Sequence, residues 1–223
     1  MSSSPARQEL ARLIDHTLLT PHATRQELEA HAAAARREGF FGICVHGSRV
    51  AQAAHFLEDS AVKLTCAINH PTGAADADVK RYETEAAIDS GAQIIEVAAN
   101  LGRLKDGDDA YGLREWRDVV EAADERPVSV AFDSSLLTPE ELERLGRAAL
   151  AAGAKGVTLS ASLGMVFLLE NVRRMRAVVG DHFGIKADGT LFDLPTVTAL
   201  LDAGATRFGV ADGHKLLSPL PRE

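Results

Sequence analysis

The chain has 223 residues, of which 46% are hydrophobic and 25% are charged, and its formal net charge is −8. These values are typical of a globular domain and argue against a disordered, collagen-like or coiled-coil chain. The acidic balance disfavours a nucleic-acid partner, because binding to phosphates needs a basic surface. Two cysteines, Cys44 and Cys66, are too few for a disulfide scaffold, and no apolar run approaches the length of a membrane span. The N-terminus lacks a signal-peptide pattern, so we expect a cytoplasmic protein that contacts no membrane.

Short apolar runs alternate with amphipathic stretches along the chain. The apolar runs predict strands, at residues 12–18, 41–45, 62–69, 93–99, 128–133, 155–160, 183–187 and 206–210. The amphipathic stretches predict helices, at residues 24–38, 48–58, 77–90, 112–125, 138–152, 167–179 and 192–203. Thr24 followed by Glu27 has the spacing of a capping box, and Thr138 followed by Pro139 marks another helix start.

This alternation predicts an α/β protein with a parallel sheet and right-handed crossovers. Eight strand candidates in one chain of this length predict a single-domain (β/α)8 TIM barrel over residues 1–223. We expect a short N-terminal helix and a frayed C-terminal tail from about residue 217. A doubly wound sheet is the alternative, but DHTLLTPHAT after the first strand lacks the glycines of a phosphate-binding turn.

Charged residues inside apolar runs are the candidates for chemistry. Lys186 lies in FGIKADG, so its side chain points either into the barrel or toward the helices. A buried lysine can act as a nucleophile, although an ordinary ion pair is the alternative. Glu96 in IIEVAAN needs a partner such as Lys186, and a structural salt bridge is again the alternative. Asp15 and His16 are adjacent in a strand and point to opposite faces, so one of the two is expected to be structural.

Motifs for metals and cofactors are missing from the sequence. There is no HExxH, no zinc-type spacing of His and Cys, no EF-hand loop and no P-loop, so we expect neither a metal nor a cofactor. The remaining histidines in helices or loops are expected to be solvated: His22, His31, His55, His182 and His214.

Seven segments fall in one order along nearly the whole chain. They are IDHTLLTPHAT, FGICVHGSRV, GAQIIEVAANLG, SSLLTPEEL, AGAKGVTLSAS, GIKADG and ATRFGVADG. Together they resemble the deoxyribose-phosphate aldolase family, whose members are class I aldolases on a (β/α)8 barrel. The resemblance implies a lyase that acts on a small molecule through a Schiff base and without a cofactor, and a homodimer is the expected assembly.

The catalytic residues depart from the family pattern at one position. The family's Schiff-base lysine on strand six, in a segment of the form VKTST, is matched here by Thr158 in VTLSA, and a hydroxyl cannot form an imine. The family's second lysine is matched by Lys186, and its two aspartates are matched by Asp15 and Glu96. The resemblance therefore implies catalysis by Lys186, Glu96 and Asp15, with Lys186 as imine former or as general acid.

The phosphate site departs as well, because KADGT and GVADG stand where the family has small glycine- and serine-rich segments. The residues expected to bind substrate are Thr158, Ser160, Asn69, Asp188, Gly189, Asp212 and Gly213. Carboxylates at 188 and 212 would repel a phosphate, so we predict a small, unphosphorylated aldehyde or hydroxylated substrate. Two alternatives stay open: the same pocket used for an isomerase, dehydratase or cyclase reaction without a Schiff base, or a non-catalytic homologue that binds a metabolite.

Overall fold

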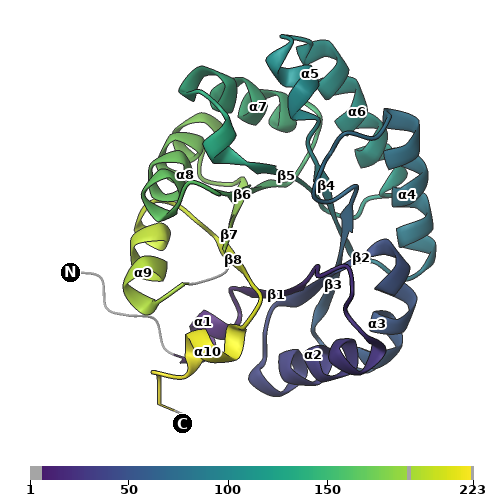
Figure 1. Ribbon diagram of the computed structural model, residues 1–223, viewed down its shortest axis with the longest axis vertical. Coiled ribbons are helices and arrows are strands. Elements are labelled where there is room, and N and C mark those ends of the chain that lie inside the picture. The colour runs from purple at the N-terminus through teal and green to yellow at the C-terminus, as the bar shows by residue number, and fades with distance from the viewer. Residues whose placement is uncertain (1–6, 190–191, 222–223) are drawn as a thin grey trace.

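The computed structural model of the chain describes residues 7–189 and 192–221 and shows a closed barrel of eight parallel strands (Figure 1). Each strand pairs with its neighbour in chain order, and β1 pairs with β8 to close the sheet. The strands are β1 (Ile14–Leu18), β2 (Gly42–His46), β3 (Lys63–Ile68), β4 (Ile94–Ala98), β5 (Val128–Asp133), β6 (Gly156–Ser160), β7 (Gly184–Asp188) and β8 (Arg207–Val210). The predicted single-domain (β/α)8 TIM barrel is confirmed, and the closed order excludes the doubly wound sheet.

Helices surround the barrel as an outer ring (Figure 1). They are α1 (Arg7–Ala11), α2 (Arg25–Glu38), α3 (Val50–Phe56), α4 (Ala77–Asp89), α5 (Leu101–Lys105), α6 (Asp109–Ala122), α7 (Pro139–Ala151), α8 (Met165–Val179), α9 (Leu194–Asp202) and α10 (Gly213–Leu217), with 3-10 turns at η1 (Gly47–Arg49) and η2 (Ser134–Leu136). Within the described residues, every helix is too short or too polar to cross a membrane. The sequence pattern predicted the long helices and missed α5, which has a single turn.

The predicted helix start at Thr24 has the geometry of a capping box. The backbone N–H of Glu27 donates to the Thr24 hydroxyl at 3.2 Å, and the backbone N–H of Thr24 donates to the Glu27 carboxylate at 2.7 Å. Thr138 begins α7 in the same way, with Pro139 as its first helical residue. These bonds satisfy N–H groups that the first helical turn leaves free, and they fix where each helix begins after its strand.

The main hydrophobic core lies between the sheet and the helices. Strand residues that face the helices are large, apolar and fully buried, and include Ile43, Ile95, Val157, Ile185 and Phe208. The opposite face, which lines the barrel interior, carries small and polar residues. TIM barrels usually fill this interior with bulky branched side chains, so the polar interior of this chain points to a functional role.

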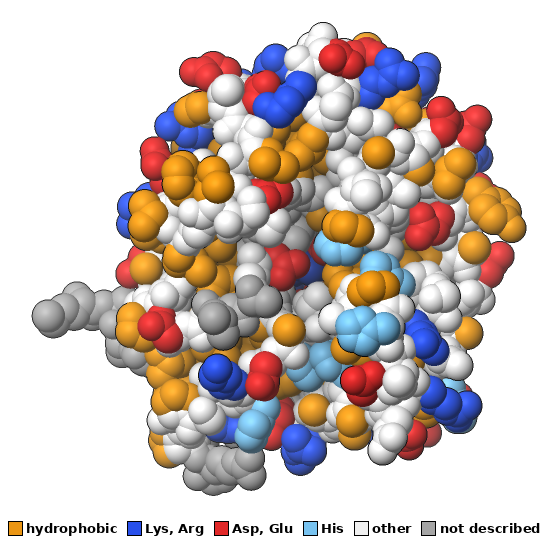
Figure 2. All heavy atoms as spheres, in the orientation of Figure 1, with side chains coloured by type: hydrophobic (Ala, Val, Ile, Leu, Met, Phe, Trp, Pro, Cys, Tyr) orange, Lys and Arg blue, Asp and Glu red, His pale blue; other side chains and the backbone are white. Residues whose placement is uncertain are grey.

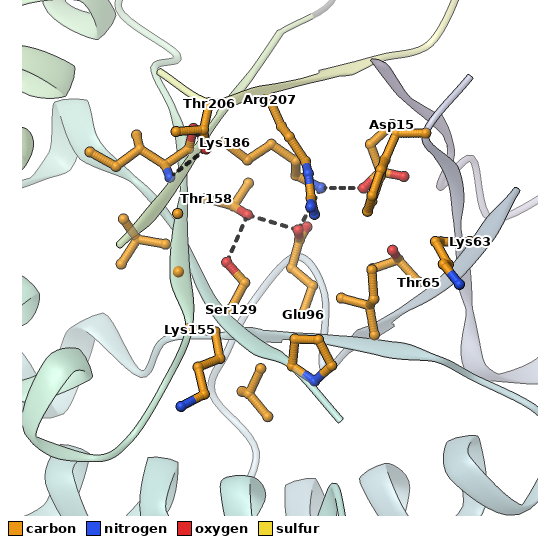
Figure 3. A pocket seen from close by; sticks show the side chains of 18 of the residues that line it. Asp15, Lys63, Thr65, Glu96, Ser129, Lys155, Thr158, Lys186, Thr206 and Arg207 are labelled. Atoms are coloured by element: carbon orange, nitrogen blue, oxygen red, sulfur yellow. Dashed lines mark hydrogen bonds and ion pairs between the residues drawn. The ribbon is translucent and has the colours of Figure 1, made fainter. Parts of the chain in front are cut away.

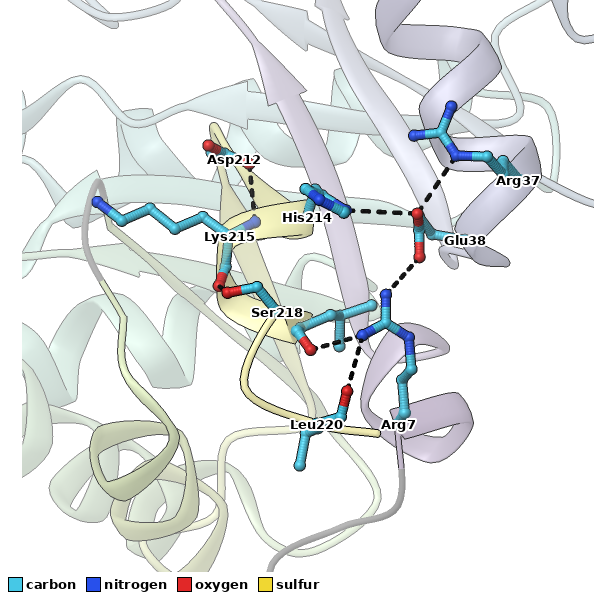
Figure 4. Close-up of polar contacts among 9 residues, drawn as sticks. Arg7, Arg37, Glu38, Asp212, His214, Lys215, Ser218 and Leu220 are labelled. Carbon is cyan, nitrogen blue, oxygen red and sulfur yellow. Dashed lines mark hydrogen bonds and ion pairs between the residues drawn. The ribbon is translucent and has the colours of Figure 1, made fainter. Parts of the chain in front are cut away.

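The two ends of the described chain are joined beside the barrel (Figure 4). The Arg7 guanidinium donates to the carbonyl oxygens of Leu217 at 2.6 Å and Leu220 at 3.3 Å, and it pairs with Glu38 at 2.6 Å. Leu220 also packs against the core. The expected short N-terminal helix is α1, and the predicted tail is held as far as Leu220, whereas residues 222–223 lie outside the described part of the chain.

Candidate active site

Strand register brings four polar side chains to the middle of the barrel interior. Thr158 on β6 lies beside Lys186 on β7, and paired residues of neighbouring strands point to the same face. Asp15 from β1 and Glu96 from β4 complete the group, and all four line one cavity (Figure 3). Each is almost fully buried. Of the two orientations that the sequence left open for Lys186, the structure has the one that points into the barrel.

The Lys186 ammonium lies between two carboxylates. Its Nζ is 3.0 Å from Oδ2 of Asp15 and 2.5 Å from Oε2 of Glu96. Among the described residues, the second oxygen of Asp15, Oδ1, is buried and has no hydrogen-bond partner. The partner that Glu96 was predicted to need is therefore Lys186, and Asp15 keeps one oxygen free to accept a proton.

A chain of hydroxyl groups extends from Glu96. The Thr158 hydroxyl donates to Oε2 of Glu96 at 2.7 Å, and the Ser129 hydroxyl lies 3.4 Å from the Thr158 oxygen. Thr158 thus holds the same carboxylate oxygen that pairs with Lys186. The sequence analysis singled out Thr158 but missed Ser129, although Ser129 lies beside Glu96 in the strand register.

The charges of this group fix the protonation state of the lysine. Burial alone would lower the pKa of Lys186, but Asp15 and Glu96 together raise that pKa well above its ordinary value. Burial raises the pKa of Asp15, and the neighbouring Lys186 only partly offsets this. One cation between two carboxylates leaves an excess of negative charge, so Lys186 is an ammonium ion at neutral pH.

Asp188 lies two residues further along β7, on the same face as Lys186. A Cβ on Gly209 of the neighbouring strand would be 2.8 Å from Oδ1 of Asp188, so the glycine makes room for this carboxylate. Burial and the nearby carboxylates of Glu96 and Asp15 raise the pKa of Asp188, Lys186 acts in the opposite direction, and the net result is a pKa of about 6. Asp188 therefore carries a negative charge at pH 7, toward the C-terminal end of the barrel.

The other residues expected to bind substrate have different surroundings. Ser160 ends β6 and is partly exposed. Asn69 accepts the backbone N–H of Ala75 at 2.9 Å, and Asp212 accepts that of Lys215 at 2.9 Å, so both side chains shape loops or helix ends. Gly189 follows β7, while a Cβ on Gly213 would be 2.7 Å from the Phe40 ring. Of the residues predicted to bind substrate, Thr158 and Asp188 are thus the ones that face Lys186 and its two carboxylates.

His16 and Asp15 point to opposite sides of β1, as the alternation predicted. The His16 ring stacks on His31 of α2, with ring centroids 3.4 Å apart. His31 is 8% exposed, so the expectation that it is solvated was wrong. The sequence pattern of α2 did not reveal this contact, because the partner ring comes from a different element.

The sequence analysis missed Cys44 as a polar group near the site. Cys44 on β2 is buried, its strand neighbour is Thr65, and burial raises the pKa of its thiol. The rings of His46 and His70 lie 5.9 Å apart, after β2 and β3, and Figure 2 shows histidines gathered beside the central hollow. Alternation in FGICVH could have placed Cys44 on the inward face.

The comparisons with known proteins agree with the barrel fold. The chain is 39% identical over 210 residues to a deoxyribose-phosphate aldolase of Bdellovibrio bacteriovorus, covering 94% of this chain and 96% of the relative. It is 40% identical over 211 residues to the enzyme of that name from Exiguobacterium sibiricum, with 94% and 96% covered. A tetrameric deoxyribose phosphate aldolase of Aeropyrum pernix has a TM-score of 0.87 at 25% identity, covering 96% of this chain and 91% of that one. No protein-family model matches the sequence.

Proposed function

Because this chain belongs to the deoxyribose-phosphate aldolase family and is an aldolase-type lyase, we propose that it acts on a small unphosphorylated hydroxy-carbonyl compound with Lys186 as a charged acid. The observation that carries the proposal is the position of the Lys186 ammonium, buried between Asp15 and Glu96. An ammonium ion in a water-poor site stabilises a developing oxyanion, because its field there is weakly screened.

The cleavage step follows from these contacts. Oδ1 of Asp15, which has no partner among the described residues, accepts the proton of the substrate hydroxyl group. The carbon–carbon bond then breaks, and its electron pair moves onto the carbonyl group to give an enolate. The enolate oxygen receives a proton from Lys186, and the resulting enol rearranges to the second carbonyl product. Rotation of the Asp15 carboxyl group then brings the protonated oxygen to the position of Oδ2, 3.0 Å from Nζ of Lys186, and the proton returns to Lys186, so both groups are restored.

Imine formation on Lys186 is the competing version of the same activity. The lysine would first have to lose a proton against the attraction of two carboxylates, and a protonated amine is not a nucleophile. Sodium borohydride in the presence of an active substrate separates the two versions. We expect no covalent adduct on Lys186 and no loss of activity, whereas a trapped adduct on Lys186 would show the imine.

The preference for an unphosphorylated substrate rests on Asp188. Its carboxylate faces the barrel and is charged at pH 7, so it would repel a phosphate dianion. We expect kcat/KM for deoxyribose to exceed that for its 5-phosphate, and Asp188→Asn to reduce the difference. Thr158→Lys alone should not restore full cleavage of deoxyribose-phosphate, and high activity from that single change would refute the phosphate argument.

A second candidate is supported by the continuous contacts from Ser129 through Thr158 and Glu96 to Lys186. Such a chain suits proton transfer without bond cleavage, as in an isomerase, dehydratase or cyclase. Incubation of carbonyl substrates in deuterated water distinguishes the candidates. Two smaller products indicate the lyase, and deuterium beside the carbonyl with an intact carbon chain indicates proton transfer. The homodimer stays a prediction.

A further inference from the structure

A cavity of about 660 Å³ opens at the end of the barrel where the strands begin (Figure 3). Its lining includes residues at or just before strand starts, among them Arg12, Lys63, Lys155 and Arg207. TIM-barrel active sites lie at the opposite end, where the strands finish. Lys186, Asp15 and Glu96 lie at the inner end of this cavity. The cavity therefore reaches these three residues from the N-terminal end of the strands, opposite to the end where TIM-barrel active sites lie.

Glycines keep this end of the interior open. Gly156 on β6 pairs with Gly184 on β7, and both line the cavity without a side chain to fill it. A Cβ on Gly156 would be 3.0 Å from the carbonyl oxygen of Gly184, and one on Gly184 would be 3.1 Å from that of Lys155. The space therefore arises from the backbone packing of β6 and β7 and does not depend on one side-chain rotamer.

The charge of the cavity is opposite to that of the whole chain. Its basic lining residues are Arg12, Lys63, Lys155, Lys186 and Arg207, and its acidic ones are Asp15 and Glu96. Both carboxylates already pair with Lys186. Within residues 7–189 and 192–221, the other four basic residues form no ion pair, although the chain has a net charge of −8. These four unpaired cations make this mouth attractive to an anion.

Arg207 is the group best placed to hold such an anion. Its guanidinium lies 3.4 Å from the centroid of the Phe41 ring and extends toward the middle of the opening (Figure 3). It is partly buried, and it has no hydrogen-bond or ion-pair partner in the described part of the chain. The Thr65 hydroxyl also lines the cavity and, with 1% exposure, has no partner among the described residues. A guanidinium fixed on an aromatic ring is suited to bidentate binding of a phosphate or a carboxylate.

We propose that this N-terminal mouth is a second ligand site, which binds a small organic anion with an apolar body. Arg207 holds the phosphate or carboxylate group, and Lys63 adds positive charge at the rim. Apolar side chains that include Phe41 and Ile94 cover the body of the ligand. The cavity shares its inner end with the Lys186 group, so an anion bound here lies next to the carboxylates that hold Lys186.

Isothermal titration calorimetry with three probes of similar shape tests the proposal. Phenyl phosphate and phenylacetate distinguish a phosphate from a carboxylate ligand, and benzyl alcohol lacks the charge. We expect one anion to bind more tightly than the alcohol, with an affinity that falls as salt is added. Arg207→Gln should weaken that binding at least about tenfold, since hydrogen bonds to charged groups are among the strongest. Arg117→Gln, at an exposed arginine of α6 outside the cavity, should leave the affinity unchanged.

Two further variants separate this site from the C-terminal mouth and allow for misfolding of Arg207→Gln. Lys63→Gln changes an exposed rim residue and should weaken binding about threefold, as expected for a screened charge. Asp188→Asn should leave the affinity unchanged if the anion is at the N-terminal mouth. The proposal is overturned if neither anion binds, if Arg207→Gln and Lys63→Gln bind as the unchanged protein does, or if Asp188→Asn alone changes the affinity.

Discussion

Two buried lysines of this chain have different surroundings. Lys80 of α4 is fully buried, and its ammonium donates to Glu115 of α6 at 2.8 Å and to the carbonyl oxygen of Ala98 at 2.9 Å. Lys186 lies between two carboxylates and lines a cavity. Burial lowers the pKa of Lys80 despite its partner, whereas two carboxylates raise the pKa of Lys186 despite burial. Lys80 and Glu115 form one ion pair that is closed to solvent and joins two helices. Lys186 has two carboxylates for one positive charge and lines a cavity, so this group can transfer protons.

The largest expected effect is the loss of activity in Lys186→Met. Without the ammonium, nothing neutralises the enolate oxygen, and we expect kcat to fall about 10³-fold, as for the loss of a strong oxyanion donor. Steady-state kinetics with the best unphosphorylated substrate measures this. Lys155→Met, at an exposed lysine, is the matched control and should keep its activity. Equal activity in the two variants would remove Lys186 from the mechanism.

Lys80→Met should change stability and leave the chemistry intact. It leaves the Glu115 carboxylate buried without its cation, and we expect a loss of about 3 kcal/mol in the free energy of unfolding, measured by urea denaturation. Lys80→Met combined with Glu115→Leu should recover much of that loss, because an apolar pair needs no desolvation of charge. A large fall in kcat in the folded single variant would contradict the structural role given to Lys80.

Glu96→Gln tests whether the second carboxylate is needed to keep Lys186 charged. The amide keeps the shape and can still accept the Thr158 hydrogen bond, but it lacks the negative charge. We expect kcat to fall about 10²-fold, the lower range for a group that takes part in acid–base catalysis. We also expect the alkaline limb of the pH–rate profile to move to lower pH, since Lys186 has lost one anion. Glu115→Gln should leave this profile in place, and a profile unchanged in Glu96→Gln would count against the role.

The smallest effect is that of Asp188→Asn on stability. Burial raises the pKa of Asp188 to about 6, so its stabilising contribution is present below 3.8 and is lost as the pH rises through 6. The variant has no charge to desolvate, and we expect it to be about 1 kcal/mol more stable than the unchanged protein at pH 7, with a smaller advantage at lower pH. Urea denaturation across that range measures the difference. Asp181→Asn, at an exposed position, should show no such trend, and the same trend there would point to a general charge effect.

Much of the fold could be predicted because it depends on local patterns. Alternating apolar runs and the capping box at Thr24 set the order of the elements and several boundaries. The charged residues inside strands, Lys186, Glu96 and Asp15, could also be found, since a charge between apolar neighbours is costly without a partner.

Contacts between distant segments could not be predicted in the same way. Lys186 and Asp15 are 171 residues apart, and they meet because β1 and β8 close the barrel. The stacking of His16 on His31 and the unpaired guanidinium of Arg207 also depend on how elements pack. The cavity at the N-terminal mouth depends on two glycines that look unremarkable in the sequence until β6 and β7 lie side by side.

The protonation state of Lys186 is the central claim, and nuclear magnetic resonance of lysine labelled with ¹⁵N at Nζ measures it directly. Comparison with the spectrum of Lys186→Met assigns the resonance. We expect an ammonium signal for Lys186 that does not titrate until the pH is above 10.5, the ordinary value for lysine. A titration midpoint of Lys186 below 10.5 would contradict the account. It would mean that the two carboxylates do not stabilise the ammonium form and that the neutral amine forms more easily than in an ordinary lysine.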